Sequence, residues 1–573
     1  MKHQIQEFLK KEYPDTDSDV FYPPEGFGDY STNIVFLLAK EQKRNPQEIA
    51  QEIIEKLKSK FKKEFEKIEV ATGGFINFYL GRDFLIKELK KISGDKKYGF
   101  NETMRGKTVM VEYTDPNPFK LFHIGHLMSN IIGETIARLY EASGAKVIRV
   151  NYQGDVGLHV AKAILGWEIL RNKNINPGPT LSEKMTFLGR CYALGSAGAD
   201  TPLVWKEFNE KIGFMDSFIK ERNKKVEEGR LDYINKVIYD KSDEGINEMY
   251  EQGKRWSLDY FKTIYKKLGT KFDDYFYESE AASNGLDIVK KHPDIFTESD
   301  GALVFNGEKY GLHTRVFISS KGLPTYEAKE LGVNKNKFEK YSPDLSLIIT
   351  GNEINAYFKV LLKVMELVMP DVAARTRHIG HGMMRLPSGK MSSRTGDVVT
   401  ADSLIEQVKT KLPGSDVETK EKIAIGAIKY FVLKQSPGHD IIFDFEKSVS
   451  IKGDAAPYLQ YTYARLASIE RKASKAGEFS FESLDKEIEF FLAKKLVRFP
   501  EVVIEASENN LPNMLALYLY ELANLTNSFY ESAPVLSEGN EKIRNARLAL
   551  VNLTSSVLEK GLNILGIEAP ERI

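Results

Sequence analysis

Two short segments of the chain contain residues whose types and spacing suit the handling of a nucleoside triphosphate. Residues 123–126 read His-Ile-Gly-His, and residues 390–394 read Lys-Met-Ser-Ser-Arg. The imidazoles of His123 and His126 can donate hydrogen bonds to phosphate oxygens as negative charge develops in a transition state. Lys390 can neutralise phosphates from the other side. Together, in this order, the segments predict two sides of one ATP site, at which an acid attacks the α-phosphate and pyrophosphate leaves.

The histidine segment is predicted to lie where a β-strand leads into a helix. The N-terminus of such a helix presents free N–H groups and the positive end of its dipole to a phosphate. Gly125 has no side chain and therefore leaves room for an adenosine to approach the backbone closely. The alternative is that both histidines are only helix caps. The predicted elements are a strand over residues 107–113, a Pro/Asn loop over 114–118, a helix from 123 to 142 and a second strand over 145–150.

The lysine–serine segment is predicted to be a mobile cationic loop. Gly389 and Gly396 flank it and are suited to act as hinges. Its candidate ATP-binding residues are Lys390, Met391 and Ser392. Taken alone, the same segment is equally well explained as a solvated turn, so its assignment depends on the histidine segment.

The composition of the chain, which has 573 residues, leaves its partners open. Lys+Arg and Asp+Glu each number 81, and a net charge of zero neither suggests nor excludes a nucleic-acid partner. Cys191 is the only cysteine, which excludes an internal disulfide and fits a reducing compartment. No apolar run reaches the roughly 18 residues of a membrane span, and no Cys/His cluster has zinc spacing. We therefore expect a cytoplasmic protein with no membrane partner and no metal held by its side chains.

The periodicity of apolar residues divides the chain into three predicted units. The strand–helix–strand order around the histidine segment is a βαβ unit, which predicts a parallel sheet with a right-handed crossover. We therefore predict an α/β fold in which an α+β unit precedes the parallel-sheet unit and an all-α unit follows it. The predicted bounds are 1–102, 103–400 and 401–573, with a helical insertion in the second unit over about 165–265.

Further segments follow in a characteristic order along nearly the whole chain. These include Asp115-Pro116-Asn117-Pro118-Phe119-Lys120, residues 149–155 (Arg-Val-Asn-Tyr-Gln-Gly-Asp) and residues 453–461 (Gly-Asp-Ala-Ala-Pro-Tyr-Leu-Gln-Tyr). With the histidine and lysine segments, they resemble the arginyl-tRNA synthetases, a family of class I aminoacyl-tRNA synthetases. Each motif alone is moderately specific for this family, whereas all of them together, in this order, are specific for it. The remaining matches are Gly157, Phe272-Asp273, Glu278-Ser279, Tyr326, Glu330, Ala464-Arg465 and the ending Leu565-Gly566-Ile567-Glu568-Ala569-Pro570-Glu571-Arg572.

The chain also departs from the pattern of this family. Most class I enzymes have a second lysine in the loop where this chain has Ser393. Arginyl enzymes with this gap commonly carry a lysine just before the histidine segment, and Lys120 fills that place, so the resemblance assigns Lys120 to the ATP phosphates. The usual aspartate after the family tyrosine is Glu330 here, one methylene longer, and the usual Asp-Gln pair is Asn352-Glu353. These two changes fall in the outer part of the predicted amino-acid pocket.

Charge indicates how the side chain of an arginine substrate would be recognised. A guanidinium is a planar fork of five N–H donors, which a carboxylate can bind through two parallel hydrogen bonds. Glu278 and Glu330 are the candidates, with Tyr326 beside them, although isolated glutamates are usually surface members of ion pairs. By resemblance, Asn117 holds the α-amino group and Gln153 lines the pocket, but a polar cluster at a strand end explains Gln153 equally well. Such a pocket rejects wrong substrates by roughly 10⁴–10⁵ without proofreading.

Two regions are expected to contact tRNA. By resemblance, the C-terminal unit reads the anticodon, whose bases are bound by stacking and by hydrogen bonds to their edges. Tyr458, Tyr461 and Arg465 are its candidates, although aromatic residues at helical spacing more often belong to a core. The N-terminal unit resembles the additional domain of the family, which contacts the tRNA elbow, and its candidates are Tyr30 and Asn33. The C-terminal segments also supply Tyr463, Phe529 and Tyr530.

The resemblance implies a Rossmann-type catalytic domain that ligates arginine to tRNA in two steps. ATP would be a substrate, accompanied by Mg²⁺, and the enzyme is expected to be a monomer that needs bound tRNA for adenylate formation. One alternative is a smaller adenylyl transferase, which would not need the long helical C-terminal unit. Another is an inactive relative that only binds RNA, against which the intact catalytic candidates argue. These candidates are His123, His126, Lys120 and Lys390.

Overall fold

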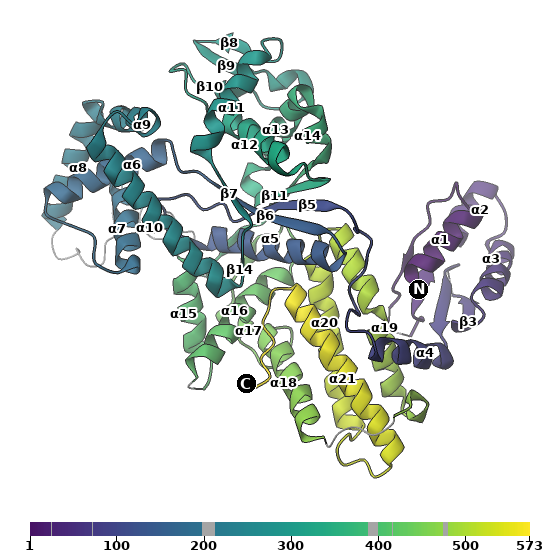
Figure 1. Ribbon diagram of the computed structural model, residues 1–573. Coiled ribbons are helices and arrows are strands. Elements are labelled where there is room, and N and C mark those ends of the chain that lie inside the picture. The colour runs from purple at the N-terminus through teal and green to yellow at the C-terminus, as the bar shows by residue number, and fades with distance from the viewer. Residues whose placement is uncertain are drawn as a thin grey trace.

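The centre of the molecule is a five-stranded parallel sheet, seen edge-on in the middle of Figure 1. The strand order is β12-β11-β5-β6-β7, and every neighbouring pair is parallel. Val109, Met110 and Val111 of β5 are fully buried, as expected for a parallel strand covered on both faces. The strands are β5 (Thr108–Glu112), β6 (Lys146–Gln153), β7 (Asp274–Tyr277), β11 (Leu345–Gly351) and β12 (Thr376–His381). The computed structural model describes residues 1–24, 26–71, 73–197, 212–387, 399–414, 416–473 and 479–572, with side chains from residue 217 onward in the fourth range.

Helix α5 (Ile124–Ala142) connects β5 to β6 and is buried along almost its whole length. It packs against β5, β6 and β11 on one side and against helices of the C-terminal unit on the other. A helix that is apolar all round belongs to a core rather than to a surface. This position explains why α5 can hold both the catalytic loop and the C-terminal helices.

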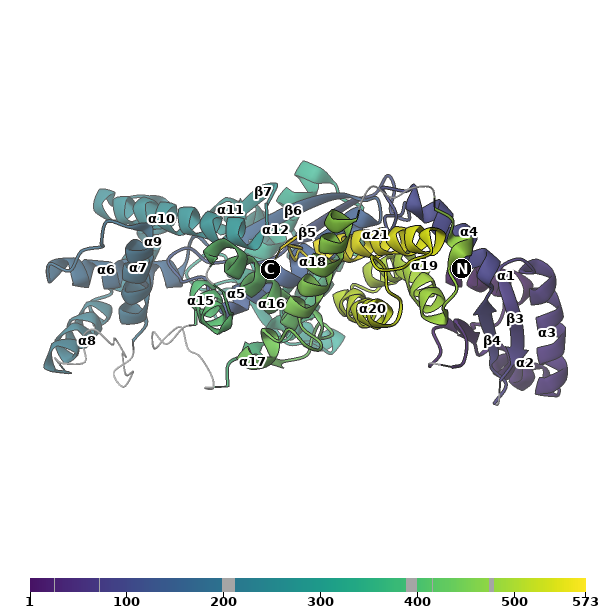
Figure 2. The ribbon, with the colours of Figure 1, turned by 90° about the horizontal axis from the view of Figure 1, so that it is seen from below.

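Two excursions leave the sheet between its strands. Between β6 and β7, the described residues form helices that extend to one end of the elongated molecule, opposite the N-terminal unit (Figure 2). The second excursion, between β7 and β11, contains an antiparallel sheet of order β10-β9-β8. The first comprises α6 (Leu158–Asn172), α7 (Leu181–Ser196), α8 (Ile212–Glu227), α9 (Arg230–Asp240) and α10 (Glu244–Leu268); the second comprises α11 (Glu278–Lys291), β8 (Thr297–Ser299), β9 (Ala302–Phe305), η1 (Gly307–Tyr310), β10 (Arg315–Ile318) and α12 (Tyr326–Tyr341).

The N-terminal unit is an antiparallel sheet of order β1-β2-β4-β3 with four helices. Its own apolar core is separate from that of the catalytic unit. Residues 30–32, just before the start of α2, form a strand because they pair with β4. The elements are α1 (Lys2–Glu12), β1 (Val20–Phe21), β2 (Tyr30–Thr32), α2 (Ile34–Gln42), α3 (Pro46–Lys60), β3 (Phe65–Val70), β4 (Ile76–Leu80) and α4 (Arg82–Ser93).

The C-terminal unit is a bundle of helices below the sheet in Figure 1. One exception to the predicted all-α character is the two-residue strand β14 (Ile441–Ile442), which pairs with β13 (Met384–Arg385). We find no helix in the described ranges with both the length and the apolar character that a membrane span requires. The other elements from residue 352 onward are η2 (Asn352–Ile354), α13 (Asn355–Val368), α14 (Pro370–Arg375), α15 (Ala401–Lys411), α16 (Val417–Leu433), α17 (Phe445–Ser448), α18 (Ala456–Lys472), η3 (Phe481–Ser483), α19 (Glu487–Glu508), α20 (Pro512–Ser532) and α21 (Glu541–Ile564).

Candidate active site

The loop that follows β5 is held in a strained conformation. Thr114, Asp115 and Phe119 have φ values of 80°, 42° and 68°, in a region that residues other than glycine rarely occupy. The Thr114 N–H donates to Ser129 Oγ at 2.9 Å, and the Phe119 N–H donates to Ser257 Oγ at 2.9 Å. Strain of this kind persists only where surrounding contacts over-determine it, and it concentrates at functional sites. The loop therefore presents its side chains from fixed positions at the carboxyl edge of the sheet.

His123 and His126 cap the N-terminus of α5 and bind to each other's backbone. The Gly125 N–H donates to His123 Nδ1 at 3.1 Å, and the His123 N–H donates to His126 Nδ1 at 3.4 Å, which makes a capping box. We predicted free N–H groups at this helix end, and this was wrong for Gly125, because the His123 imidazole already accepts its hydrogen. The structure therefore shows that both histidines cap the helix through Nδ1, and the Nε2 atom of each ring is left for a further role.

The capping hydrogen bonds fix which ring nitrogen carries the proton. Each Nδ1 accepts an N–H, so in the neutral ring the hydrogen is on Nε2. Burial and the charge of Lys120 lower the pKa of His123 to about 4. Burial and the neighbouring His123 lower the pKa of His126 well below its ordinary value. Both rings are therefore neutral near pH 7, and their Nε2–H groups can donate to an oxyanion without a change in charge.

Lys120 lies on the same rigid loop, close to both histidines. Its positive charge contributes to the lowered pKa of His123 and of His126. Its Nζ lies 5.1 Å from the centroid of the Tyr192 ring. Within the described part of the chain, no carboxylate forms an ion pair with it. An ammonium next to neutral histidines and without an acidic partner is suited to bind an anion.

The predicted lysine–serine loop falls within residues 388–398, which are outside the described residues. The chain that follows it is attached to the histidine segment. The Ile124 N–H donates to Val399 O at 3.2 Å, and His123 forms a β-bridge with Thr400. Val399 and Thr400, which directly follow that range, therefore lie beside the histidine segment. The candidates that fall in the undescribed range are Lys390, Met391 and Ser392.

Three of the candidates for arginine binding converge around Gly154. A Cβ on Gly154 would lie 2.3 Å from Asn117 Oδ1 and 2.9 Å from Glu278 Oε1, so a side chain there would displace both groups. This approach brings Asn117, from the loop after β5, close to Glu278, the first residue of α11. Gln153, the last residue of β6, is fully buried, and neither of its amide atoms has a hydrogen-bond partner among the described residues. Buried polar atoms are rarely left unpaired, and the Tyr265 hydroxyl of α10 lies beside this amide, so a polar cluster at the strand end explains Gln153 as well as a ligand pocket does.

Glu278 is paired with a lysine that the sequence analysis missed. Lys329 Nζ lies 2.8 Å from Glu278 Oε2, and each side chain is 7% exposed. Burial raises the pKa of Glu278, while Lys329 opposes that shift. The other oxygen, Oε1, faces Asn117 across Gly154. Glu278 can therefore accept a substrate donor through Oε1 while Lys329 holds Oε2. The only sequence signal for Lys329 is its position immediately before Glu330.

Tyr326 and Glu330 come from the first two turns of α12. Glu330 is 2% exposed, and its Oε2 has no hydrogen-bond partner among the residues that the structure describes. The Tyr326 side chain is 43% exposed. Burial and then the charge of Glu330 nevertheless raise the pKa of its hydroxyl well above the ordinary value. This combination is expected of a ring that lies deep in the fold without being covered by neighbours. Both side chains are therefore positioned to meet a ligand.

Two further tyrosines face Glu330 and were not predicted. The hydroxyls of Tyr152 and Tyr357 are buried and have no hydrogen-bond partner in the described ranges. Burial and then the charge of Glu278 raise the pKa of Tyr152, and burial and then Glu330 raise that of Tyr357. The rings of Tyr326 and Tyr357 lie 5.3 Å apart between centroids. Position at the end of a strand was a signal for Tyr152, whereas Tyr357 resembled any helical core residue.

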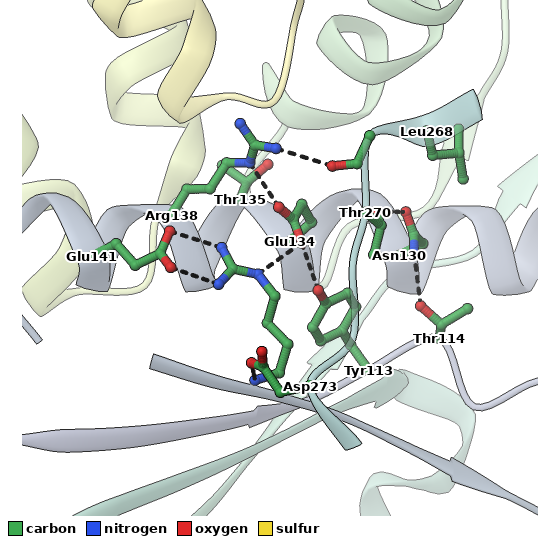
Figure 3. A network of polar contacts seen from close by, with 12 residues as sticks. Tyr113, Thr114, Asn130, Glu134, Thr135, Arg138, Glu141, Leu268, Thr270 and Asp273 are labelled. Atoms are coloured by element: carbon green, nitrogen blue, oxygen red, sulfur yellow. Dashed lines mark hydrogen bonds and ion pairs between the residues drawn. The ribbon is translucent and has the colours of Figure 1, made fainter. Parts of the chain in front are cut away.

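A polar network behind the catalytic loop connects it to the C-terminal unit (Figure 3). Glu134 of α5 accepts hydrogen bonds from Tyr113 Oη at 2.5 Å, from Arg149 Nε at 3.1 Å and from Arg138 Nε at 2.7 Å. Arg138 Nη1 donates to Asn563 O at 2.8 Å, near the end of α21. Continuous hydrogen bonds thus run from the end of β5 to the C-terminal helix and hold both against α5.

The candidates for anticodon binding differ in exposure. Tyr461 and Tyr530 are 41% and 44% exposed, whereas Tyr463 and Phe529 are buried, so only the first two can stack on a base. The Arg465 guanidinium lies 5.1 Å from the Tyr461 ring centroid and 5.3 Å from that of Tyr530. A flat cation between two exposed rings is suited to stack on bases. The sixth candidate of this region is Tyr458, whose hydroxyl donates to Asn524 Oδ1 at 2.9 Å.

Of the two N-terminal candidates, Tyr30 is incompatible with RNA contact in this structure. It is fully buried, and its hydroxyl donates to Glu501 Oε2 of α19 at 3.1 Å. Tyr30 instead fastens the N-terminal unit to the C-terminal bundle. Asn33 is partly exposed at the start of α2, and Phe36, one turn further on, is 42% exposed. An exposed ring beside a polar side chain is a better RNA contact than Tyr30, and the sequence analysis missed Phe36.

Comparison with known proteins assigns the chain to a family. A family model described as the catalytic domain of class I tRNA synthetases (R) matches residues 88–188 and 205–445. Models described as the arginyl tRNA synthetase N terminal domain and the DALR anticodon binding domain match residues 1–80 and 459–573. The chain belongs to the arginyl-tRNA synthetase family. The predicted family and the predicted α/β fold class are thereby confirmed.

Relatives of this arginyl-tRNA synthetase family member cover nearly its full length. An arginine–tRNA ligase of Fusobacterium nucleatum is 31% identical over 562 residues, which span 95% of this chain and 93% of the relative. One from Porphyromonas gingivalis is 29% identical and covers 96% and 94%. The solved Thermus thermophilus arginyl-tRNA synthetase has a TM-score of 0.76 and 25% identity, covering 100% and 99%. That of Plasmodium falciparum has a TM-score of 0.77 and 23% identity, covers 100% and 98%, and supports the fold alone.

Proposed function

We propose that this chain ligates arginine to tRNA in two steps. A carboxylate oxygen of arginine attacks the α-phosphorus of ATP, forming arginyl-adenylate as the bond to pyrophosphate breaks. The terminal ribose hydroxyl of tRNA then attacks the carbonyl carbon, and AMP leaves. The observation that carries the proposal most is that one rigid loop holds Asn117 close to Glu278 and Lys120 close to the histidines. Amino acid and nucleotide would therefore meet at this loop.

The ATP side of the site is proposed to act by charge stabilisation. His123 and His126 donate from Nε2 to the phosphates, and Lys120 neutralises negative charge as pyrophosphate forms. Gly125 admits the adenosine to the backbone. Lys390, Met391 and Ser392 remain proposals from the sequence, which place a cationic loop over the β- and γ-phosphates. The attachment of Val399 to Ile124 supports this arrangement, because it brings the residue that follows the loop to the histidine segment.

The arginine side is proposed to bind the guanidinium between acids and tyrosines. Glu278 Oε1 and the unpaired Oε2 of Glu330 accept its N–H groups, and Tyr326 lies against it. Asn117 Oδ1 accepts from the α-amino group, and Gln153 lines the pocket. Buried acceptors without other partners favour a substrate that supplies several N–H donors.

We propose that Mg²⁺ arrives with ATP, held mainly by phosphate oxygens and water, as is usual for this ion. When bound, it neutralises part of the phosphate charge. Among the described residues, no three or more His, Cys, Asp and Glu side chains are grouped so that they could hold a metal ion.

The three units are proposed to have separate roles in binding and charging tRNA. Residues 1–102 contact the elbow through Asn33, residues 103–400 catalyse, and residues 401–573 contact the stem and read the anticodon. The exposed Tyr461 ring and the partly exposed Arg465 guanidinium beside it support the last role. Tyr458, held by Asn524, would flank them. We also propose that the enzyme works as a monomer in the cytoplasm, where its single buried cysteine, Cys191, stays reduced.

An ATP–pyrophosphate exchange assay with each of the twenty amino acids tests the proposal. We expect exchange with arginine alone, and only when the cognate tRNA is present. Exchange driven by lysine or glutamate would contradict the assigned substrate. Absence of exchange with arginine and tRNA, in a protein that still binds tRNA, would instead support the alternative of an inactive RNA-binding relative.

A further inference from the structure

A cluster of three acids, of which Glu112 and Glu330 are buried and Asp115 is partly buried, lies next to the proposed guanidinium site. Glu112 ends β5, Asp115 follows it in the strained loop, and Glu330 approaches from α12. Lys337 Nζ lies 2.8 Å from Glu112 Oε2, and these side chains are 0% and 2% exposed, respectively. Within the described part of the chain, no cation forms an ion pair with Asp115 or Glu330, although Asp115 Oδ1 accepts the Tyr152 N–H at 2.8 Å. The cluster therefore contains three carboxyl groups and one lysine.

Without a bound cation, such a cluster cannot remain fully ionised. Two unbalanced negative charges in a buried place cost more free energy than the uptake of a proton. Burial and then the charge of Glu112 raise the pKa of Glu330 to about 8, and the same two causes raise that of Asp115. Because Asp115 and Glu330 interact, the proton belongs to these two carboxyl groups together. The unpaired Oε2 of Glu330 is the atom at which a bound cation can replace this proton.

The other groups around Glu330 do not remove this imbalance. Lys337 and a hydrogen bond from Tyr326 favour the ionised form, whereas Glu278 disfavours it. The tyrosines that face Glu330 are uncharged near pH 7, because burial raises their pKa values well above the ordinary one. The groups that face it are Glu112 and Asp115 from β5 and its loop, Glu278 from α11, Tyr152 from β6, Tyr357 from α13, and Tyr326 and Lys337 from α12.

Building on the proposed function, we propose that arginine binding expels a proton from the cluster of Glu112, Asp115 and Glu330. The carboxyl O–H gives its proton to solvent, and the carboxylate formed accepts N–H bonds from the guanidinium, which stays charged throughout. Glu112 is a positioning residue in this exchange, since it acts through Glu330 and through Lys337. A neutral isostere such as citrulline cannot drive the proton out, so the exchange favours a cationic substrate.

Titration calorimetry of arginine into the full chain with bound tRNA measures this exchange directly. Buffers of different ionisation enthalpy at pH 7, such as phosphate and Tris, give the number of protons released. We expect about one proton per arginine, and an affinity that falls by roughly tenfold for each pH unit between 7.5 and 6. No proton release would overturn the inference, while pyrophosphate exchange with arginine would still support the proposed function.

A substrate analogue separates the cluster from the α-amino group. δ-Guanidinovaleric acid carries the guanidinium and the carboxylate but has no α-amino group. We expect it to release the same single proton as arginine. Release with arginine and none with this analogue would assign the proton to the α-amino group and overturn the inference.

Two variants of the buried pair test the role of Glu112. Glu112→Gln removes the like charge and frees Lys337 to pair with Glu330, so proton release should fall toward zero and the pH dependence of affinity should flatten. Lys337→Gln should still release a proton when arginine binds, and the pH dependence of its arginine affinity should move to higher pH. Damage to the fold alone would shift both variants in the same direction, and proton release unchanged in Glu112→Gln would refute the role of Glu112. If neither variant folds, the wild-type proton count still decides.

Discussion

The imidazole rings of His123 and His126 lie 3.7 Å apart between centroids, at an interplanar angle of 16°. Each Nδ1 accepts a hydrogen bond from the backbone of the helix start, and the Nε2–H groups are left to donate. One pair of side chains thus caps the helix and sets its own tautomers. The two roles can be separated by substitution.

His123→Asn keeps an oxygen that can cap the helix and removes the Nε2–H donor. We expect the melting temperature to stay close to that of the wild type, because asparagine is among the best N-caps. The rate of adenylate formation should fall by about 10²–10³, the effect of losing one donor to an oxyanion. Pyrophosphate exchange and thermal unfolding measure the two quantities. His123→Ala, which loses both functions, should match this rate and melt lower; full activity of His123→Asn would leave His123 as a cap only.

The sequence allowed prediction of the parallel sheet, the helix that begins at the histidine segment and the helical C-terminal unit, because their apolar periodicities are long and regular. It did not reveal Lys329, Tyr152 or Tyr357. These residues reach the arginine side of the site from separate strands and helices, so no short spacing connects them. Tyr30 shows the reverse problem, since a polar aromatic residue in a candidate RNA-binding motif proved to be buried against Glu501. Tertiary contacts, within the catalytic unit for the first three residues and between units for Tyr30, decided these cases, and local patterns do not encode such contacts.

Glu278→Gln tests the arginine side of the site. The amide keeps the shape but loses the charge that pairs with a guanidinium, and hydrogen bonds to charged groups contribute about 1.5–3 kcal/mol. We expect the KM for arginine to rise by about 10–100-fold, with the KM for ATP little changed. Steady-state aminoacylation at varied arginine and ATP measures both constants.

Glu280→Gln serves as the matched control for that variant. Glu280 lies in the same turn of α11 and is exposed. Its substitution should leave both KM values unchanged. If Glu278→Gln raised the two KM values equally, Glu278 would not belong to the arginine pocket.

The buried histidines predict a loss of stability in acid. Burial lowers the pKa of His159 to about 3, whereas an unfolded histidine has its ordinary value of about 6.5. Between these values the unfolded chain binds a proton that the folded chain does not, so stability is complete above pH 6.5 and is lost as pH falls toward 3. As the pH falls from 6.5 to 4.5, we expect the melting temperature of His159→Gln to decrease less steeply than that of the wild type. A steeper fall in the variant would contradict the assigned sign.

Arg547 of α21 is a buried centre of charge in the C-terminal unit. It is 1% exposed and bonds to Glu489 at 2.6 Å, to Glu538 at 2.7 Å and to Asp485 at 3.1 Å. Removing one partner of a buried pair costs about 3–5 kcal/mol, so Arg547→Met should unfold this unit at clearly lower urea concentration. Lys90→Met breaks the ion pair of Lys90 with Glu482, whose side chains are 51% and 54% exposed. This variant should unfold at almost the same urea concentration as the wild type. Equal effects of the two variants would refute this assignment.

The central claim, that a nucleotide-binding histidine segment and an acid-lined pocket together select arginine, is tested most directly by aminoacylation of tRNA. Purified chain, ATP, Mg²⁺ and total tRNA are incubated with each of the twenty amino acids in labelled form, and the label on the 3′ end of tRNA is counted. The account predicts label from arginine alone. Label from lysine or from any other amino acid in place of arginine would contradict it.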